Sequence, residues 1–189
     1  MRTETYQKYK ESFNLKKRLG YGLDGDAYLD EFGKVVKISF FYDYDSNIEK
    51  RYDTVKKSIH YIMENNPAGF VKINSFKELE SGYRDFIFDN EKVRQKYYIF
   101  CYTMNKGQEL NSDERKLFHA LLRGDDFSEN YKEIVKEFSY LKFNTKKVYD
   151  FIESLKKCPI QHIDLGTNNI MRFGANYKLI DIDRVKIKE

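Results

Sequence analysis

Short apolar runs separated by turn residues fill the first half of the chain, a pattern that predicts β-strands. Residues 15–30 are predicted to form two strands joined by a glycine-rich turn, and residues 33–40 a third strand. A tight turn at Glu31-Phe32-Gly33 leads into that third strand. Two more strands are predicted over residues 70–76 and 97–103.

One helix is predicted within this half, because apolar residues recur there at the spacing of a single helical face. These residues are Ile48, Tyr52, Val55, Ile59 and Ile62. The sequence Asn65-Asn66-Pro67-Ala68-Gly69 ends the helix, since Pro and Gly interrupt helical geometry.

The second half of the chain has helical periodicity, with polar residues placed to cap the helices. Asn111, with Glu114 three residues later, resembles a capping box. Ser128 and Asn144 are predicted to cap two further helices, the second of which ends at Pro159.

A small β-hairpin is predicted near the end of the chain, from apolar runs over residues 169–173 and 178–180. The pattern therefore places a β-rich lobe before an α-rich lobe. We expect an α+β fold in which residues 1–189 form a single domain. Its N-terminal lobe would cover about 13–104, its hinge about 102–107 and its C-terminal lobe about 108–189.

Charge and aromatic content narrow the function classes. The 189 residues include 34 Lys+Arg and 30 Asp+Glu, a net charge of +4, which allows a phosphate-bearing partner but does not indicate nucleic-acid binding. The 15 Phe and 16 Tyr argue against disorder. No apolar run approaches the roughly 18–20 residues that span a bilayer, so no membrane association is expected. The N-terminus lacks the apolar core of a signal peptide, and we expect the chain in a cytosol.

A glycine-rich motif, Gly20-Tyr21-Gly22-Leu23-Asp24-Gly25, has the spacing G-x-G-x-x-G. Glycines let backbone N–H groups approach phosphate oxygens, because no Cβ is in the way. A plain tight hairpin is the alternative interpretation. A Rossmann turn is disfavoured, since it requires a helix after the glycines and residues 26–29 instead continue as a strand. A glycine-rich hairpin lying over phosphates fits better.

Lys37 lies between apolar residues of the third predicted strand, in the sequence Val35-Val36-Lys37-Ile38. This placement favours a side chain that faces the interior or a cleft, and a solvent-facing lysine is the alternative. Because the glycine-rich turn lies shortly upstream, Lys37 is expected on the strand next to it.

The most specific motif is a loop with the sequence His162-Ile163-Asp164-Leu165-Gly166-Thr167-Asn168-Asn169. The Asp164 carboxylate can accept a hydroxyl proton and orient a nucleophile. The amide carbonyl of Asn169 can ligate a hard cation such as Mg²⁺. A polar loop with two incidental turn residues is the alternative. His162 is expected to be a packed structural histidine.

Two further carboxylates, Asp181 and Asp183, follow the apolar residues Leu179 and Ile180. They are candidates to complete a set of oxygen ligands for Mg²⁺ bound to nucleotide phosphates. For Asp183, a solvated turn carboxylate is the alternative.

The order of these motifs resembles that of the protein-kinase-like superfamily, over about residues 15–185. The short chain is most similar to the reduced kinases of bacteriophages and bacterial effectors. The resemblance implies a bilobal fold, with a small antiparallel sheet and one helix in the N-terminal lobe and a reduced, mostly helical C-terminal lobe. It also implies ATP and Mg²⁺ as the nucleotide and metal.

The resemblance implies a role for each matching residue. Lys37 would hold the α- and β-phosphates, Asp164 would position the acceptor hydroxyl, and Asn169 and Asp181 would bind the metal. The glycine loop of Gly20, Gly22 and Gly25 would cover the phosphates, and the backbone of Tyr102, Thr103 and Met104 would accept adenine in the hinge.

Lys37 would also need an acidic partner from the first helix. Glu49 is our choice and Asp53 the alternative, and both could instead lie on the solvated face of that helix.

Several positions depart from the family pattern. Ile163 stands where regulated kinases have Arg, and Gly166 where Ser/Thr kinases have Lys. Eight residues follow Asp181, too few for an activation segment or a helical substrate platform. We therefore expect no regulation by loop phosphorylation. We also expect a protein substrate to be recognised by another surface, or by a platform from a homodimer or partner.

The favoured function is that of a minimal Ser/Thr protein kinase, which transfers the γ-phosphate of ATP to a protein hydroxyl. Its protein substrates would include host proteins, in the host cytoplasm, if the chain is phage-encoded. One alternative is a nucleotide-binding pseudokinase that acts as an interaction module. Another is a small-molecule kinase similar to aminoglycoside phosphotransferases.

Overall fold

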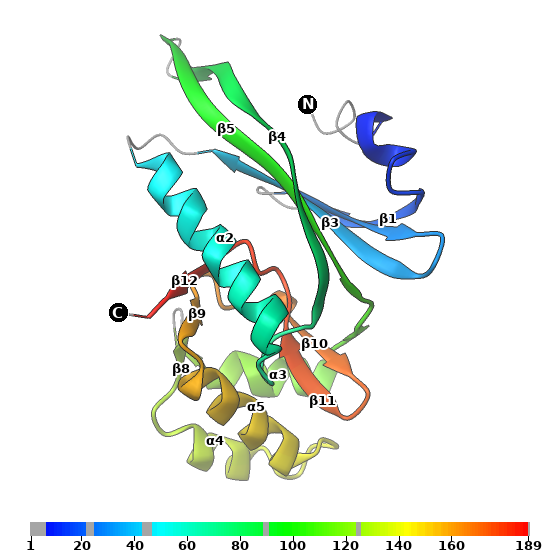
Figure 1. Ribbon diagram of the computed structural model, residues 1–189. Helices are drawn as coiled ribbons and strands as arrows, with labels where there is room; N and C mark the ends of the chain where they lie inside the picture. Colours follow the sequence, from blue (N-terminus) through cyan, green and yellow to red (C-terminus); the bar gives the residue numbers. More distant parts are fainter. Residues whose placement is uncertain (1–6, 22–24, 43–46, 89–90, 124–125, 189) are drawn as a thin grey trace. The chain divides into compact units, whose positions relative to one another are not determined.

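The computed structural model describes residues 7–21, 25–42, 47–88, 91–123 and 126–188. The chain divides into two compact units that both contain strands and helices (Figure 1), which confirms the α+β class. Unit 1 comprises Met1–Met63 and Ile73–Lys106, and unit 2 comprises Glu64–Lys72 and Gly107–Glu189. Residues 64–72 therefore belong to unit 2, although they lie inside the range expected for the N-terminal lobe.

Unit 1 is built on a five-stranded antiparallel sheet with the strand order β1-β2-β3-β5-β4. Its strands are β1 (Leu15–Tyr21), β2 (Gly25–Asp30), β3 (Lys34–Tyr42), β4 (Ile73–Phe88) and β5 (Glu91–Asn105), with helix α2 (Ile48–Asn65) between β3 and β4. The first three strands and the helix confirm the sequence predictions. The predicted turn before β3 is also present: Gly33 has φ 75°, and Asp30 accepts hydrogen bonds from the backbone N–H groups of Phe32 and Lys34.

Strands β4 and β5 are much longer than the strands predicted over residues 70–76 and 97–103. Strand β3 pairs with β5 only as far as Tyr97, so the more distal part of β4 and β5 forms a two-stranded ribbon (Figure 1). Tyr83 and Arg84, which point to opposite faces of this ribbon, are both exposed. Gln95, which pairs with Arg84, is buried, but a single buried polar residue gives no alternating apolar pattern that could have predicted the extension.

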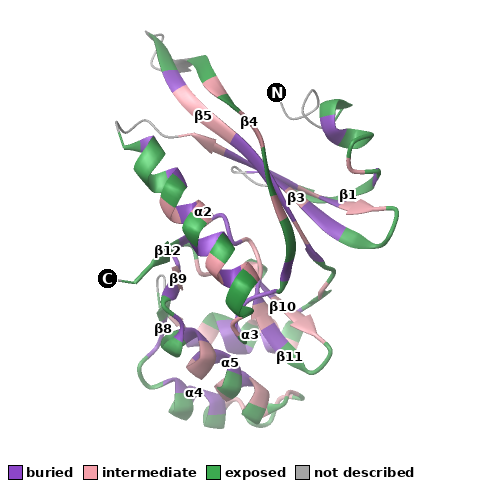
Figure 2. Cartoon of the chain, in the orientation of Figure 1, coloured by how far each residue is buried: buried purple, intermediate pink, exposed green. Residues whose placement is uncertain are grey.

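The two faces of the sheet are covered by different parts of the chain, and buried residues line both α2 and the central strands (Figure 2). On one face, Tyr9 and Leu15 join a buried cluster with Val36, Ile38 and Cys101, among others. On the other face, the Tyr52 ring of α2 stacks on the Tyr98 ring at 4.0 Å between centroids. The sheet is thus an apolar layer between α2 and the N-terminal residues.

Unit 2 contains three helices, one short 3₁₀ turn and several short strands within the described residues. The helices are α3 (Ser112–Leu121), α4 (Tyr131–Glu137) and α5 (Thr145–Lys157). The strands are β6 (Gln108–Glu109), β7 (Leu122–Arg123), β8 (Asp126–Phe127), β9 (Ile160–His162), β10 (Ile170–Phe173), β11 (Asn176–Leu179) and β12 (Val185–Ile187). They form three small sheets with the strand orders β11-β10-β6, β12-β9 and β7-β8. The 3₁₀ turn η1 covers Thr167–Asn169. The β10–β11 hairpin confirms its prediction.

The capping predictions have mixed outcomes. Asn111 and Glu114 form the predicted capping box, and the Asn144 side chain accepts a hydrogen bond from the backbone N–H of Lys147. The prediction for Ser128 was wrong, because α4 begins at Tyr131 and the Ser128 hydroxyl donates to the Asn130 side chain.

Residues 64–72 attach to β11 of unit 2. Phe70 forms a parallel bridge with Leu179, and the Lys178 ammonium donates to the carbonyl oxygens of Ala68 at 3.0 Å and Phe70 at 3.1 Å. Burial lowers the pKa of Lys178. Phe70 and Val71, predicted as the start of a strand in the first lobe, therefore pair with unit 2. No helix in the described part of the chain has the length and apolar character needed to cross a membrane.

Glu80 of β4 holds the N-terminal residues against unit 1. Its carboxylate accepts hydrogen bonds from the Lys8 ammonium, from the Tyr97 hydroxyl at 2.5 Å and from the Tyr9 hydroxyl at 3.3 Å. The Lys8 contact is the largest cause of a lowered pKa for Glu80.

A lowered carboxyl pKa predicts a pH-dependent stability. The contribution of Glu80 is complete above its ordinary pKa of 4.5 and is lost as the pH falls through the folded value. We expect the parent chain to be more stable than Glu80→Gln near neutral pH, with the difference shrinking between about pH 5 and pH 3. Urea unfolding followed by circular dichroism measures it. Glu64→Gln, at an exposed position of α2, is the control. A Glu80→Gln difference that does not change with pH would contradict the prediction.

Candidate active-site residues in the loop after strand β9

The imidazole of His162 connects two parts of unit 2 that carry candidate catalytic residues. His162 ends β9 and is 3% exposed. Its Nε2 lies 3.0 Å from the carbonyl oxygen of Asp181, and its Nδ1 lies 3.2 Å from the backbone nitrogen of Asp164. The ring thus holds the main chain at Asp164 and at Asp181 in one place.

Burial lowers the pKa of His162 below its ordinary value of 6.5. The ring is therefore neutral at pH 7 and has one N–H donor and one acceptor. Since the Asp164 N–H must be accepted, Nδ1 is the acceptor and Nε2 carries the proton donated to Asp181. The histidine is a packed structural residue, as the sequence indicates.

Asn169 is tied to the same loop by its side chain. Its Nδ2 donates to the backbone carbonyl oxygen of Asp164 at 2.7 Å. The backbone carbonyl oxygen of Asn169 accepts a hydrogen bond from the Ile180 N–H at 2.9 Å. Because the amide nitrogen is used in the bond to Asp164, the orientation of the side chain leaves Oδ1 as the group that can meet a cation. Hydrogen bonds therefore gather Asp164, Asn169 and Asp181 within unit 2.

Asp181 has φ 61°, in the left-handed region that non-glycine residues seldom occupy. Such a conformation costs on the order of 1–3 kcal/mol and persists where the surroundings impose it, often at functional sites. The neighbouring Asp183 is only 5% exposed, so it is not a solvated turn carboxylate.

The donor set of Asn169 and Asp181 fits Mg²⁺. Mg²⁺ prefers oxygen ligands and is usually held by one or two carboxylates together with substrate phosphates. Among the described residues, no three His, Cys, Asp or Glu side chains gather into a metal site. A metal held by this chain would therefore depend on oxygens from a nucleotide as well as on the amide and carboxylate groups.

Lys37 and the other candidate residues of the first lobe lie in unit 1. Lys37 is half-buried on β3, opposite Ala27 of β2 and Tyr102 of β5. Since side chains alternate along a strand, it shares a face with Phe41, whose ring contacts Tyr52 of α2. Lys37 is thus on the α2 face of the sheet.

The acidic residue chosen as its partner has a different neighbour in the structure. Glu49 has a 66% exposed side chain, and its carboxylate accepts a hydrogen bond from the Lys96 ammonium. Asp53 is also exposed. The interpretation of both carboxylates as part of a solvated helix face therefore agrees with their exposure.

The hinge residues named from the sequence belong to a strand. Tyr102, Thr103 and Met104 lie within β5, paired on one side with β3 and on the other with β4. The pairing continues to Asn105, whose side chain also accepts a hydrogen bond from Lys34 at 2.6 Å. These three residues therefore belong to a paired strand of unit 1, and the hinge over about 102–107 stays a prediction.

The three glycines of the G-x-G-x-x-G motif have different surroundings. Gly25 starts β2, where a Cβ would lie 2.3 Å from the carbonyl oxygen of Ile38. Gly20 has no atom within 4 Å of its ideal Cβ position. Gly22 lies outside the described residues. Close approach of β2 to β3 is therefore sufficient to require glycine at position 25.

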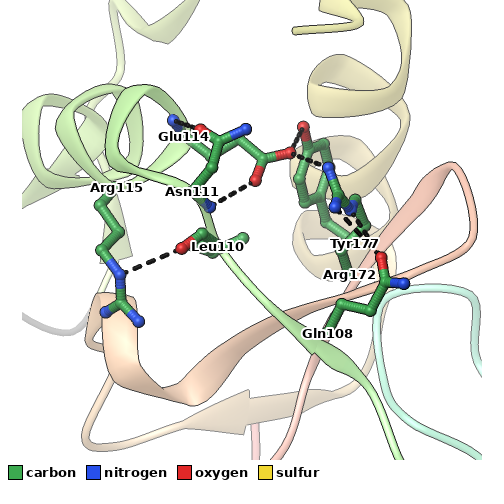
Figure 3. Close-up of polar contacts among 7 residues, drawn as sticks. All are labelled: Gln108, Leu110, Asn111, Glu114, Arg115, Arg172 and Tyr177. Atoms are coloured by element: carbon green, nitrogen blue, oxygen red, sulfur yellow. Dashed lines mark hydrogen bonds and ion pairs between the residues drawn. The ribbon is translucent and has the colours of Figure 1, made fainter.

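The start of α3 carries a polar network that the sequence did not reveal (Figure 3). Glu114, 2% exposed, accepts hydrogen bonds from Arg172 at 3.3 Å, Tyr177 at 3.0 Å and the backbone N–H of Asn111 at 2.8 Å. Arg172 also donates to the Gln108 side chain at 3.1 Å. The capping box was visible in the sequence, but nothing local indicates that its glutamate meets residues from the β10–β11 hairpin.

A cavity of about 250 Å³ in unit 2 is lined in part by residues of β9 and of the loop that follows it. Its lining includes His162 and Leu165 on the loop side and Phe70, Phe127, Leu155 and Leu179 as apolar walls. Asp164, Asn169 and Asp181 are not among the lining residues. We therefore place the candidate chemistry at the loop itself and not in this cavity.

The His162 contacts predict a stability effect. In His162→Phe, the part-buried N–H of Asp164 and carbonyl of Asp181 lose their partner, which costs about 1–3 kcal/mol in the free energy of unfolding. Chemical denaturation measures the loss. His119→Phe makes the same change at an exposed position and is the control. A His162→Phe variant as stable as this control would show that the ring does not hold the loop.

The glycine surroundings give a second prediction. Gly25→Ala places a methyl group against the β3 backbone and should lower the free energy of unfolding by about 1–3 kcal/mol. Gly20→Ala, where space is open, should cost much less. Thermal and urea unfolding of the two variants provide the comparison, and equal losses would count against it.

No family model matches the sequence, and no curated protein matches it. Among solved structures, the chain is similar to "ROP18 kinase domain in complex with AMP-PNP and sucrose", with a TM-score of 0.48 and 14% sequence identity. The similarity covers 90% of this chain and 51% of the other, so this chain spans about half of the length of the ROP18 chain. Similarity at this level assigns neither an activity nor a ligand.

Proposed function

We propose that this chain is an ATP- and Mg²⁺-dependent phosphotransferase of the protein-kinase-like type, acting on Ser or Thr hydroxyls of proteins. One observation supports it most: the hydrogen-bonded arrangement in unit 2 that gathers Asp164, Asn169 and Asp181. His162 joins the first of these residues to the third, at 3.2 Å and 3.0 Å, and the Asn169 amide joins the second to the first at 2.7 Å. These bonds join the main chain at Asp164 and Asp181 to the side chain of Asn169, which supports the proposal that the two carboxylates and the amide oxygen act in one site.

Asp164 is the catalytic base in this proposal. Its side chain is exposed, while its backbone is fixed by the imidazole and by the Asn169 amide. A carboxylate in this setting can orient an acceptor hydroxyl and take its proton. The hydroxyl oxygen then forms a bond to the γ-phosphorus, the bond from that phosphorus to the bridging oxygen breaks, and ADP leaves.

Asn169 and Asp181 would hold Mg²⁺ through the amide Oδ1 and the carboxylate. A bound Mg²⁺ would neutralise part of the negative charge on the phosphates. The chain's own contribution is to fix both donors: the Asn169 side chain through the Asp164 carbonyl, and Asp181 through its left-handed backbone and the His162 ring.

Lys37 would hold the α- and β-phosphates, as the resemblance implies. Its half-buried position in a paired strand suits a fixed ammonium. Two glycines of the G-x-G-x-x-G motif, Gly20 and Gly25, are described. Gly20 has open space at its Cβ position, so packing does not explain why this position is a glycine. Whether Glu49 or Asp53 supports Lys37 stays a prediction.

Substitution of Asp164 tests the proposal. We expect Asp164→Asn to reduce phosphate transfer from radiolabelled ATP by at least about 100-fold, since a positioned acid–base residue contributes roughly that factor, while ATP binding is retained. Lys37→Met should also abolish transfer. Asp150→Asn, at an exposed position of α5, is the matched control.

The acceptors in this assay are the chain itself, a generic protein substrate and the proteins of a cell lysate, with phosphorylated residues identified by mass spectrometry. Transfer by Asp164→Asn at the parent rate would refute the catalytic role. ATP binding by the parent without transfer to any acceptor would instead favour a nucleotide-binding module.

A further inference from the structure

Arg115 of helix α3 contacts the turn that carries Asn169. Its Nη1 donates to the Asn168 side-chain oxygen at 3.2 Å. Its Nε donates to the carbonyl oxygen of Leu110 at 3.2 Å, a bond that Figure 3 shows. Its Nη2 donates to the Glu109 carboxylate at 3.1 Å. All three nitrogens of one guanidinium are therefore used, which restricts the side chain to a single orientation.

Asn168 lies inside the 3₁₀ turn η1, directly before Asn169. Gly166, at the N-cap of this turn, makes no side-chain cap, and the Asn169 N–H bonds back to the Gly166 carbonyl at 2.9 Å. A turn this short has few hydrogen bonds of its own. The Arg115 contact therefore adds support from a different element of unit 2.

The helix that carries Arg115 is itself firmly held. Its neighbour Glu114 is buried and bonded to Arg172, Tyr177 and the N-cap residue Asn111 (Figure 3). The guanidinium thus extends from a fixed backbone, which is the condition under which a supporting residue can define the position of another group.

We propose that Arg115 is a positioning residue for the metal ligand Asn169, acting through Asn168. The metal role rests on the proposed function, whereas the holding contact does not. Partners that orient metal ligands without touching the metal commonly change metal affinity by 10–100-fold when they are removed. Arg115 touches neither substrate nor metal in this proposal.

Amide hydrogen exchange tests the holding contact without any need for activity. In Arg115→Ala, the N–H of Asn169 and the N–H of Ile180, which bonds to Asn169, should exchange roughly 3- to 10-fold faster. Amides of α3 should keep their rates, because the Glu114 network is intact. Lys116→Ala removes an exposed charge from the same helix and is the control. Unchanged exchange at Asn169 and Ile180 would overturn the inference.

Metal binding tests the role. The affinity of the ATP-bound chain for Mn²⁺, measured by electron paramagnetic resonance, should fall about tenfold in Arg115→Ala and in Asn168→Ala. The double variant should lose no more than either single variant, since both remove the same contact. At saturating Mg²⁺, kcat should approach the parent value. Parent-like Mn²⁺ affinity, or additive losses in the double variant, would overturn the inference.

The two proposals fail in different ways. A parent chain that transfers no phosphate overturns the proposed function and, with it, the metal role of Arg115. An active parent whose Arg115→Ala variant keeps its exchange rates and Mn²⁺ affinity overturns only the positioning role.

Discussion

The neutral imidazole of His162 is the interaction on which the candidate site depends. A buried ring with one donor and one acceptor satisfies one backbone N–H and one backbone carbonyl group. Those two groups belong to Asp164 and Asp181, which lie on separate segments of unit 2. The two ring nitrogens lie on one rigid plane, so the donor and the acceptor keep a fixed spacing. The histidine therefore holds the main chain of the candidate site in place.

The short strands around the loop give this arrangement its rigidity. Strand β9 pairs with β12 just before Asp164, and the Ile163 N–H continues the contact to the carbonyl oxygen of Arg184 at 2.8 Å. Hairpin β10–β11 starts just after Asn169, over a core in which the Phe118 ring contacts Tyr177 at 5.0 Å. Functional groups on a loop pinned at both ends lose little entropy when they bind a ligand.

Sequence patterns predicted elements in two ways. Helix α2 buries one face, so its apolar residues recur at a regular period. The first three strands were predicted from short apolar runs and the turn residues between them, because β1 buries only Leu15 and β3 is buried on both faces. The distal part of the β4–β5 ribbon was missed, because exposed residues such as Tyr83 and Arg84 give no regular apolar period. The helix start at Ser128 was mistaken because a capping residue type is also a good partner for another side chain, here Asn130.

The sequence by itself determined which side chains are candidates for chemistry and in what order: a lysine on a strand, then Asp164, Asn169 and Asp181. Tertiary structure decided what surrounds them. It placed Glu49 beside Lys96, buried Asp183, and joined Glu114 to Arg172 and Tyr177, which are 58 and 63 residues away. Local patterns report propensity and periodicity, whereas a buried charge finds its partner only when distant segments pack and exclude water.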